Sequence, residues 1–266
     1  NVTEGDISPG IQTGFCHDTG GGWSEGTLVA HRSQIHRVPD DVSDEATVAV
    51  EPLACAVHAA LSARPGPDET TIVLGAGSVG LLVVGALRRL TDAGRIFCVA
   101  KHERQKSEAL RLGADAVVHP KEIYTTLPTM LGASARRPEL GKPVVLGGAD
   151  RVLECVGSPG TMEDAIRLSR PGGAVTLVGM PGARSALDLT PLWHGEVSFS
   201  GVYAYGREDY EGEETTSFDL ALRLANPLKL DTLVGPCFRL SEYGEAVAAA
   251  RSAGRDGNVK VVFDLR

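Results

Sequence analysis

Short apolar runs alternate with helix-length amphipathic segments between residues 71 and 202. Each run is about five residues long, and the segments between them carry the polar and charged positions of surface helices. This alternation is typical of βαβ units and a parallel sheet. The predicted strands are Thr71–Leu74, Arg95–Ala100, Ala116–Val118, Arg151–Cys155, Ala174–Val178 and Val197–Val202, and the predicted helices are Val79–Leu90, Glu103–Leu112 and Thr161–Ser169.

The segments on either side are less regular. Residues 1–22 are polar and glycine-rich and predict a loop. Ser43 is a candidate N-cap for an alanine-rich helical run, which Pro52 should divide into two short helices or kink. Residues 132–148 predict an inserted surface loop. Toward the end, an acidic stretch after Gly206 leads into the predicted elements Thr216–Leu224 (helix), Tyr243–Ala253 (helix) and Val259–Leu265 (strand).

Composition narrows the class of protein. The 266 residues are 42% apolar and 23% charged, which is typical of a soluble globular chain of about one to two domains. A net charge of -8 argues against a general nucleic-acid binder, and no segment predicts membrane association or a targeting signal, so we expect a cytoplasmic protein. The five cysteines form no CxxC pair, so the sequence predicts neither a disulfide framework nor a self-contained zinc site.

The strongest local motif is Gly75-Ala76-Gly77-Ser78-Val79-Gly80, between an apolar strand and an apolar helix. In this context the first glycine permits a sharp turn and the second lets a pyrophosphate approach the backbone. The third, Gly80, permits close packing of helix on strand, and the helix N-terminus presents free N–H groups to the phosphates. A tight strand–helix turn without a ligand is the alternative. The motif predicts a Rossmann domain that binds a dinucleotide.

The residues after the second strand bear on which dinucleotide is bound. In this fold an acidic residue usually ends that strand and binds the adenosine ribose hydroxyls. Here the strand ends in Ala100, and Lys101 and Arg104 follow. Two cations and no carboxylate suit a 2′-phosphate, which favours NADP over NAD. A solvated basic helix start is the other reading of the same residues.

Taken in order, the motifs resemble the medium-chain dehydrogenase/reductase family, and within it the zinc-dependent alcohol and polyol dehydrogenases related to sorbitol dehydrogenase. The resemblance covers nearly the whole chain. The motifs that carry it, besides the glycine fingerprint, are Gly21-Gly22-Trp23-Ser24-Glu25, Val38-Pro39-Asp40, Glu51-Pro52-Leu53-Ala54, Leu112-Gly113-Ala114-Asp115, Val156-Gly157-Ser158, Arg170-Pro171-Gly172-Gly173 and Val178-Gly179-Met180-Pro181-Gly182.

The resemblance implies roles for individual residues. Glu51 would lie at the catalytic zinc, as a ligand or as a carboxylate close to one; without the resemblance, the sequence favours a capping or salt-bridging carboxylate. Cys55 and Val79 match positions that face the nicotinamide ring. Lys260 matches a cation that touches the pyrophosphate. Val156 and Val178, in their glycine-containing turns, complete the cofactor-binding set with Gly75, Gly77, Ser78, Gly80, Lys101 and Arg104.

The chain also departs from the family. Family members carry a preceding segment with further zinc ligands, the proton-relay residues and a structural-zinc lobe, and we find no counterpart in this sequence. Cys16-His17-Asp18 is a poor replacement, because adjacent residues point apart and seldom bind one metal together. His31, His36, His58, His119 and His194 stand alone without partners at metal-ligand spacing. The chain as given is therefore expected to bind cofactor without turning over alcohols.

These observations predict an α/β protein with three segments. Residues 53–208 would form a doubly wound, parallel-sheet Rossmann domain, and residues 1–52 and 209–266 would be parts of an incomplete GroES-like catalytic domain. The intact protein would transfer hydride between NADP(H) or NAD(H) and a secondary alcohol or polyol and its ketone, with zinc assistance, as a homodimer or homotetramer. The alternatives are a zinc-free reductase of the same family and a dinucleotide-binding module without catalysis.

Overall fold

The chain folds into two compact units, which we describe separately. The computed structural model describes residues 22–24, 35–182, 184 and 186–265. One unit spans residues 52–204, and the other combines the chain up to Glu51 with the chain from Tyr205 onward. The predicted loop over 1–22 and the Cys16-His17-Asp18 triplet lie almost wholly outside the described residues, as does His31.

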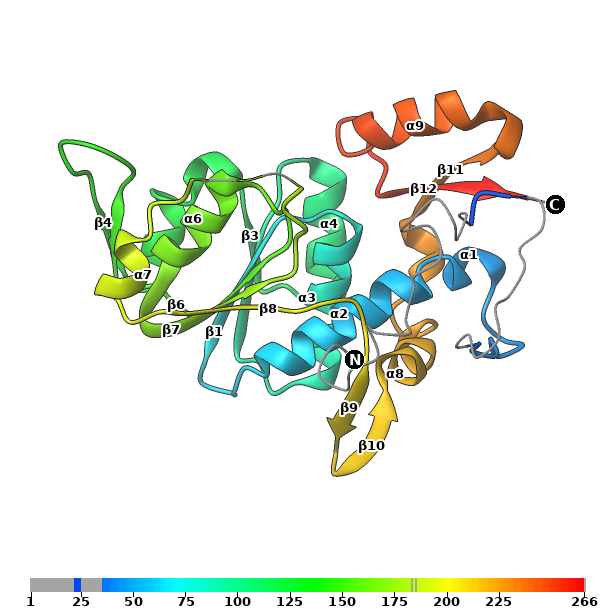
Figure 1. Ribbon diagram of the computed structural model, residues 1–266, viewed down its shortest axis with the longest axis horizontal. Helices are drawn as coiled ribbons and strands as arrows, with labels where there is room; N and C mark the ends of the chain where they lie inside the picture. Colours follow the sequence, from blue (N-terminus) through cyan, green and yellow to red (C-terminus); the bar gives the residue numbers. More distant parts are fainter. Residues whose placement is uncertain (1–21, 25–34, 183, 185, 266) are drawn as a thin grey trace. The chain divides into compact units, whose positions relative to one another are not determined.

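A six-stranded parallel sheet forms the centre of the 52–204 unit (Figure 1). Its strand order, β3-β2-β1-β6-β7-β8, is that of a doubly wound sheet, so the predicted α/β fold is confirmed. All six predicted strands are present, most with small shifts at their ends. They are β1 (Thr70–Leu74), β2 (Arg95–Val99), β3 (Ala116–Val118), β6 (Ala149–Glu154), β7 (Ser169–Leu177) and β8 (Ser198–Gly201).

Alternate residues of each strand point to opposite faces of the sheet, so apolar residues lie on both faces and helices cover them. On one face Ile72 of β1 and Val152 of β6 belong to an apolar cluster that includes Ile166 of α6 (Pro159–Leu168). Val73, between two members of that cluster, faces the other way and is fully buried. The other helices of this unit are α2 (Val50–Ala63, whose first residues belong to the second unit), α3 (Ser78–Leu90), α4 (Glu103–Leu112), α5 (Thr126–Met130) and α7 (Thr190–His194).

The segment predicted as a surface loop at 132–148 contains a β-hairpin instead. Strands β4 (Ser134–Arg136) and β5 (Val144–Leu146) pair antiparallel, with contacts to α5 and α6. Its strands are only three residues long, too short for the alternation of apolar and polar residues that reveals a strand in sequence. The prediction of a loop there was wrong for these six residues.

The second unit is built from both flanks of the sheet-forming segment. Ser43 caps α1 (Asp44–Thr47) by accepting a hydrogen bond from the Ala46 N–H, at 3.2 Å, and α2 begins after a short break. The expected division into two helices is confirmed, but it precedes Pro52, which lies in the first turn of α2, where proline costs no helical hydrogen bond. The other elements are β9 (Arg207–Tyr210), β10 (Glu213–Thr216), α8 (Ser217–Leu224), β11 (Val234–Arg239), α9 (Tyr243–Ser252) and β12 (Lys260–Asp264).

The acidic stretch after Gly206 forms a second unpredicted hairpin. Strands β9 and β10 pair antiparallel across Glu211 and Gly212, which have φ angles of 56° and 80°. Two successive residues with positive φ are the signature of a tight hairpin turn. The high charge of the strands concealed them, because the pattern lacks the apolar face of an ordinary strand.

Within the described parts of the chain, no helix is both long enough and apolar enough to cross a membrane. The mostly apolar residues 71–87 are divided between β1 and α3.

Candidate functional site

Three glycine-containing turns meet where β1, β6 and β7 end. These strands are neighbours and parallel, so their carboxyl ends lie at one edge of the sheet. The chain leaves β1 toward β2 on one side, while β6 lies on the other, which makes this edge the switch point where ligands bind in doubly wound folds. The turns are residues 75–77, 155–158 and 178–180.

The first turn is the glycine fingerprint, and two of its glycines are required by the backbone or the packing. Gly75 has a φ of 97°, and its N–H donates to the Val99 carbonyl at 3.2 Å. A Cβ at Gly80 would lie only 1.9 Å from the Gly75 carbonyl oxygen. Helix α3 therefore packs closely on the turn, as the glycine motif predicts.

Gly77 differs from the other two glycines of the motif because nothing in the described part of the chain requires a glycine there. It is the N-cap of α3, with a φ of -72° that any residue can adopt, and nothing lies within 4 Å of the place where its Cβ would be. The helix has no acidic residue in its first turn, which begins with Ser78. The first N–H groups of a helix lack intrahelical partners and attract anions. This end of α3 thus offers both space and favourable charge.

Glu154, the last residue of β6, joins the other two turns. Its fully buried carboxylate accepts hydrogen bonds from the backbone N–H groups of Val156, at 2.9 Å, and Gly157, at 2.9 and 3.0 Å. Its backbone carbonyl accepts from the N–H groups of Val178 and Gly179, both at 2.8 Å. One residue therefore fixes the turn after β6 and the turn after β7.

The two turns touch through their backbones. A Cβ at Gly179 would lie 2.2 Å from the Gly157 nitrogen, and a Cβ at Gly157 would lie 2.8 Å from the Met180 backbone. Val156 projects beside the first turn, since a Cβ at Gly75 would lie 2.5 Å from its Cγ2 atom, yet the residue is half exposed. An exposed valine at the switch point can contact a flat apolar ring.

The cysteines near this edge are not reactive groups. Burial raises the pKa of Cys98 to about 12. Burial also raises the pKa of Cys155 well above its usual value, and the neighbouring Glu154 carboxylate adds to the shift. Both thiols therefore stay protonated at neutral pH.

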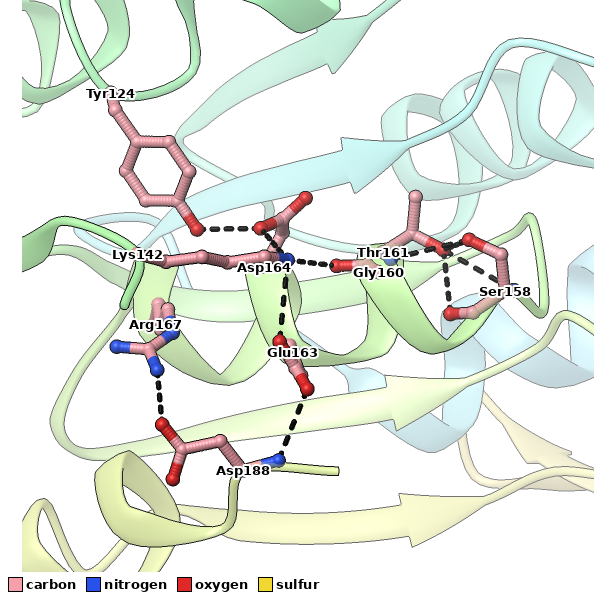
Figure 2. A network of polar contacts seen from close by, with 9 residues as sticks. All are labelled: Tyr124, Lys142, Ser158, Gly160, Thr161, Glu163, Asp164, Arg167 and Asp188. Atoms are coloured by element: carbon pink, nitrogen blue, oxygen red, sulfur yellow. Dashed lines mark hydrogen bonds and ion pairs between the residues drawn. The ribbon is translucent and has the colours of Figure 1, made fainter. Parts of the chain in front are cut away.

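Helix α6, which begins just after the 155–158 turn, is held by charged side chains (Figure 2). Lys142 places its ammonium 2.7 Å from Asp164, 3.4 Å from Glu163 and 2.8 Å from the Gly160 carbonyl oxygen. The Tyr124 hydroxyl donates to Asp164, and burial together with this hydrogen bond raises the pKa of the tyrosine.

Further contacts tie the start and the far side of this helix. Ser158 caps α6 by accepting from the Thr161 N–H at 3.2 Å. Arg167 pairs with Asp188, whose N–H donates to Glu163 at 3.1 Å. Figure 2 shows Asp188 approaching the helix from the opposite side to Tyr124. The start of α6, and with it the 155–158 turn, is thus fixed in position.

The two cations predicted to bind a 2′-phosphate, Lys101 and Arg104, differ in their surroundings. Lys101 is exposed in the turn between β2 and α4. Arg104, in the first turn of α4, pairs with Glu108 at 3.2 Å. Glu108 is nearly buried and pairs also with Arg111, at 2.7 Å. Ala100, directly after β2, is buried, and as an alanine it offers no carboxylate for the ribose hydroxyls.

The candidate metal residue, Glu51, does not lie in a metal-binding cluster of described residues. It is exposed in the first turn of α2, with Cys55 one turn later. In the described ranges no three His, Cys, Asp or Glu side chains come together as ligands would. Lys260 interacts electrostatically with Glu51. Burial lowers the pKa of this lysine, and the Glu51 carboxylate opposes the shift. Glu51 alone does not fit a catalytic zinc, which needs about three protein ligands.

Sequence reasoning missed two buried carboxylates, Glu154 and Glu108. Glu154 had a detectable signal, because an acidic residue inside the apolar run Arg151–Cys155 must find hydrogen-bond donors when it is buried. Glu108 gave a weaker one, since arginines lie four residues before it and three after it on the same helix.

Comparison with known proteins agrees with this architecture. Residues 78–218, more than half of the chain, match the family described as zinc-binding dehydrogenase. The chain is similar to L-idonate 5-dehydrogenase of Vitis vinifera, 29% identical over 89% of this chain and 61% of that protein. It is also similar to sorbitol dehydrogenase of Arabidopsis thaliana, 30% identical over 86% of this chain and 59% of that protein. The chain thus spans about three fifths of the length of these relatives.

Solved structures share the fold. A 2R,3R-butanediol dehydrogenase from Bacillus subtilis superposes with a TM-score of 0.65 at 23% identity, over 85% of this chain and 60% of that one. An alcohol dehydrogenase from Escherichia coli CFT073, complexed with the cofactor NADH, gives a TM-score of 0.65 at 18% identity, over 85% of this chain and 61% of that one. The matched region begins at Ser78, at the start of α3, and covers the 155–158 turn and the 178–180 turn, so the chain belongs to the zinc-binding dehydrogenase family.

Proposed function

We propose that the 52–204 unit binds a nicotinamide dinucleotide along the carboxyl edge of its sheet. The observation that carries this proposal is the empty space in front of Gly77, at a helix start where Gly75 and Gly80 are fixed by backbone and packing but Gly77 is not. A pyrophosphate group would be stabilised there, because the N–H groups of Ser78 and Val79 and the positive end of the helix dipole favour its negative charge.

The remaining residues of the edge suit the other parts of the cofactor. Val156 and Val178 would pack against the nicotinamide ring, held by the Glu154 hydrogen bonds. Cys55 and Lys260 remain predictions from the family resemblance. Lys101, with Arg104 beside it and Ala100 in place of an acid, favours a 2′-phosphate on the adenosine ribose, so NADP(H) is the proposed cofactor.

In the intact protein we propose hydride transfer between this cofactor and a secondary alcohol or polyol and its ketone. The support is the family, whose similar members include proteins named idonate, sorbitol and threonine dehydrogenases. The bound dinucleotide supplies or accepts the hydride, and this chain orients it and shields one face of the ring. Because the described residues do not fit a zinc ion, we derive no step through a metal.

Replacing Gly77 with alanine tests the binding proposal. The new methyl group should weaken both NADPH and NADH about 10-fold or more, because it fills the pyrophosphate position. Folding stability should stay within about 1 kcal/mol of the wild type, since the backbone suits alanine and no atom is displaced. Fluorescence titration of both cofactors, with urea unfolding as the control, measures this. Wild-type affinity in the variant, or tighter binding of NADH than NADPH by the wild type, would contradict the proposal.

We also propose that two copies pair through β8. Among the described residues this strand ends the sheet and pairs with β7 alone, and an open edge is a liability unless covered. Within the described chain, β4 and β5 form a separate sheet with contacts to α5 and α6, so this hairpin does not extend the sheet at β8. Light scattering should give the mass of a dimer or a larger assembly at micromolar concentration. A monomer at that concentration would argue against pairing.

A further inference from the structure

Glu108 is a nearly buried carboxylate that binds two arginines of its own helix. Its side chain is 5% exposed, with one oxygen 3.2 Å from an Nη atom of Arg104 and the other 2.7 Å from Nε of Arg111. A carboxylate so far removed from water needs its cations to compensate its charge. Arg104, although 43% exposed itself, is therefore tied to Glu108.

This pairing sets the direction of the Arg104 side chain. The residue lies in the first turn of α4, and Glu108 lies one turn further along. Side chains of a helix otherwise lean toward its N-terminus. The ion pair instead joins the guanidinium to Glu108, a residue one turn further from the turn after β2, where the adenosine ribose of a bound dinucleotide would lie.

Lys101 has no such restraint. It precedes the helix, its side chain is exposed, and it forms no ion pair with any residue that the structure describes. Its backbone N–H donates to the Gln105 side chain, as does that of His102, which fixes the turn without engaging the ammonium group. The two cations next to the proposed ribose site thus differ: one is available and the other is held.

We infer that Glu108 determines cofactor specificity by holding Arg104 away from the 2′-phosphate, so that Lys101 alone meets this group. The inference rests on the proposed dinucleotide site. The sequence suggested two equivalent cations at the 2′-phosphate. We now expect Lys101 to contact the phosphate and Arg104 to be held by Glu108. This chain should therefore prefer NADPH over NADH less strongly than it would with two cations in contact with the phosphate. The preference for NADPH can be raised by releasing Arg104, without adding a positive charge.

Replacing Glu108 with glutamine releases Arg104 while keeping the size of the side chain. We expect NADPH to bind about 3- to 10-fold more tightly, with NADH changed by less than about 2-fold, because only NADPH carries the group that the freed guanidinium can bind. The variant R104Q/E108Q should lose this gain. Fluorescence titrations of both cofactors measure the effect. An unchanged NADPH affinity in E108Q, or a gain that persists in the double variant, would overturn the inference.

The variant E103Q is the matched control. It removes an equal charge from the first turn of the same helix, but Glu103 pairs with Lys106 and not with Arg104. We expect it to leave NADPH affinity within about 2-fold of the wild type, since it frees no guanidinium. A gain equal to that of E108Q would mean that net charge, and not the restraint on Arg104, controls binding.

A second experiment leaves Glu108 unchanged. R104Q in the otherwise unaltered chain should change NADPH affinity by less than about 2-fold, because the restrained arginine does not reach the phosphate. A loss of about 10-fold confined to NADPH would show that Arg104 already binds it, and would overturn the inference with the proposed function intact. Failure of the wild type to bind either cofactor would overturn both together.

Discussion

Replacing Gly80 with alanine will prevent α3 from packing on the end of β1. The added Cβ would lie 1.9 Å from the Gly75 carbonyl oxygen and 2.9 Å from the carbonyl carbon, both backbone atoms that cannot rotate away. Relief requires the helix start to move from the strand and to expose part of the core around Leu81, which is fully buried. We expect the free energy of unfolding to fall by about 3 kcal/mol or more, with loss of cofactor binding.

Urea unfolding followed by circular dichroism measures this loss. The Gly77→Ala variant is its control, because it makes the same chemical change three residues earlier where the chain has room. The two variants should therefore separate stability from binding: one loses both, and the other loses binding alone. A Gly80→Ala protein with wild-type stability would mean that the turn and the helix can separate at little cost.

Replacing Glu154 with alanine will release the 155–158 turn of the proposed cofactor site. The N–H groups of Val156 and Gly157 lose the carboxylate that accepts from them, and a space opens in a fully buried position. Leaving such donors without an acceptor costs about 1–3 kcal/mol each, so unfolding should become easier by about 2–4 kcal/mol. NADPH affinity should fall about 10-fold or more, because the nicotinamide side of the site loses its shape.

Two comparisons separate this positioning role from general instability. Glutamine at 154 keeps one acceptor oxygen and should restore part of the affinity. A fragment cofactor, 2′,5′-ADP, lacks the nicotinamide half and should bind Glu154→Ala as it binds the wild type, since its phosphates and adenosine lie by the other turns. Equal losses of NADPH and 2′,5′-ADP in the variant would contradict the positioning role.

The sheet and the glycine fingerprint were predictable because their causes are local. Buried parallel strands are short apolar runs, and the steric demands of Gly75 and Gly80 lie within one strand–turn–helix unit. The hairpin of β9 and β10 was not predictable by the same means, because its four-residue strands are charged and its turn depends on a positive φ at Glu211, a residue type that seldom adopts it.

The carboxylates of the candidate site depend on partners that sequence order does not reveal. Glu154 contacts turns that follow two different strands, so its role appears only when the parallel pairing brings Gly157 and Gly179 together. The assignment of Glu51 to a metal site has a similar dependence: a ligand set is a property of several segments brought together in space, and the sequence motif at 51–54 fixes only one member of it.

The order of the chain through the two units bears on how the protein reaches its native state. Residues 52–204 are contiguous, and each of their βαβ steps closes over a short span of chain. The other unit joins segments from both flanks; the Asn226 amide, for example, donates to the Asp41 carboxylate at 2.9 Å across 185 residues. Contacts of such high sequence separation form late, because closing a long loop costs entropy before any contact compensates. During synthesis the 52–204 unit can therefore fold on the ribosome, while the residues before it pair only after their downstream partners have been made.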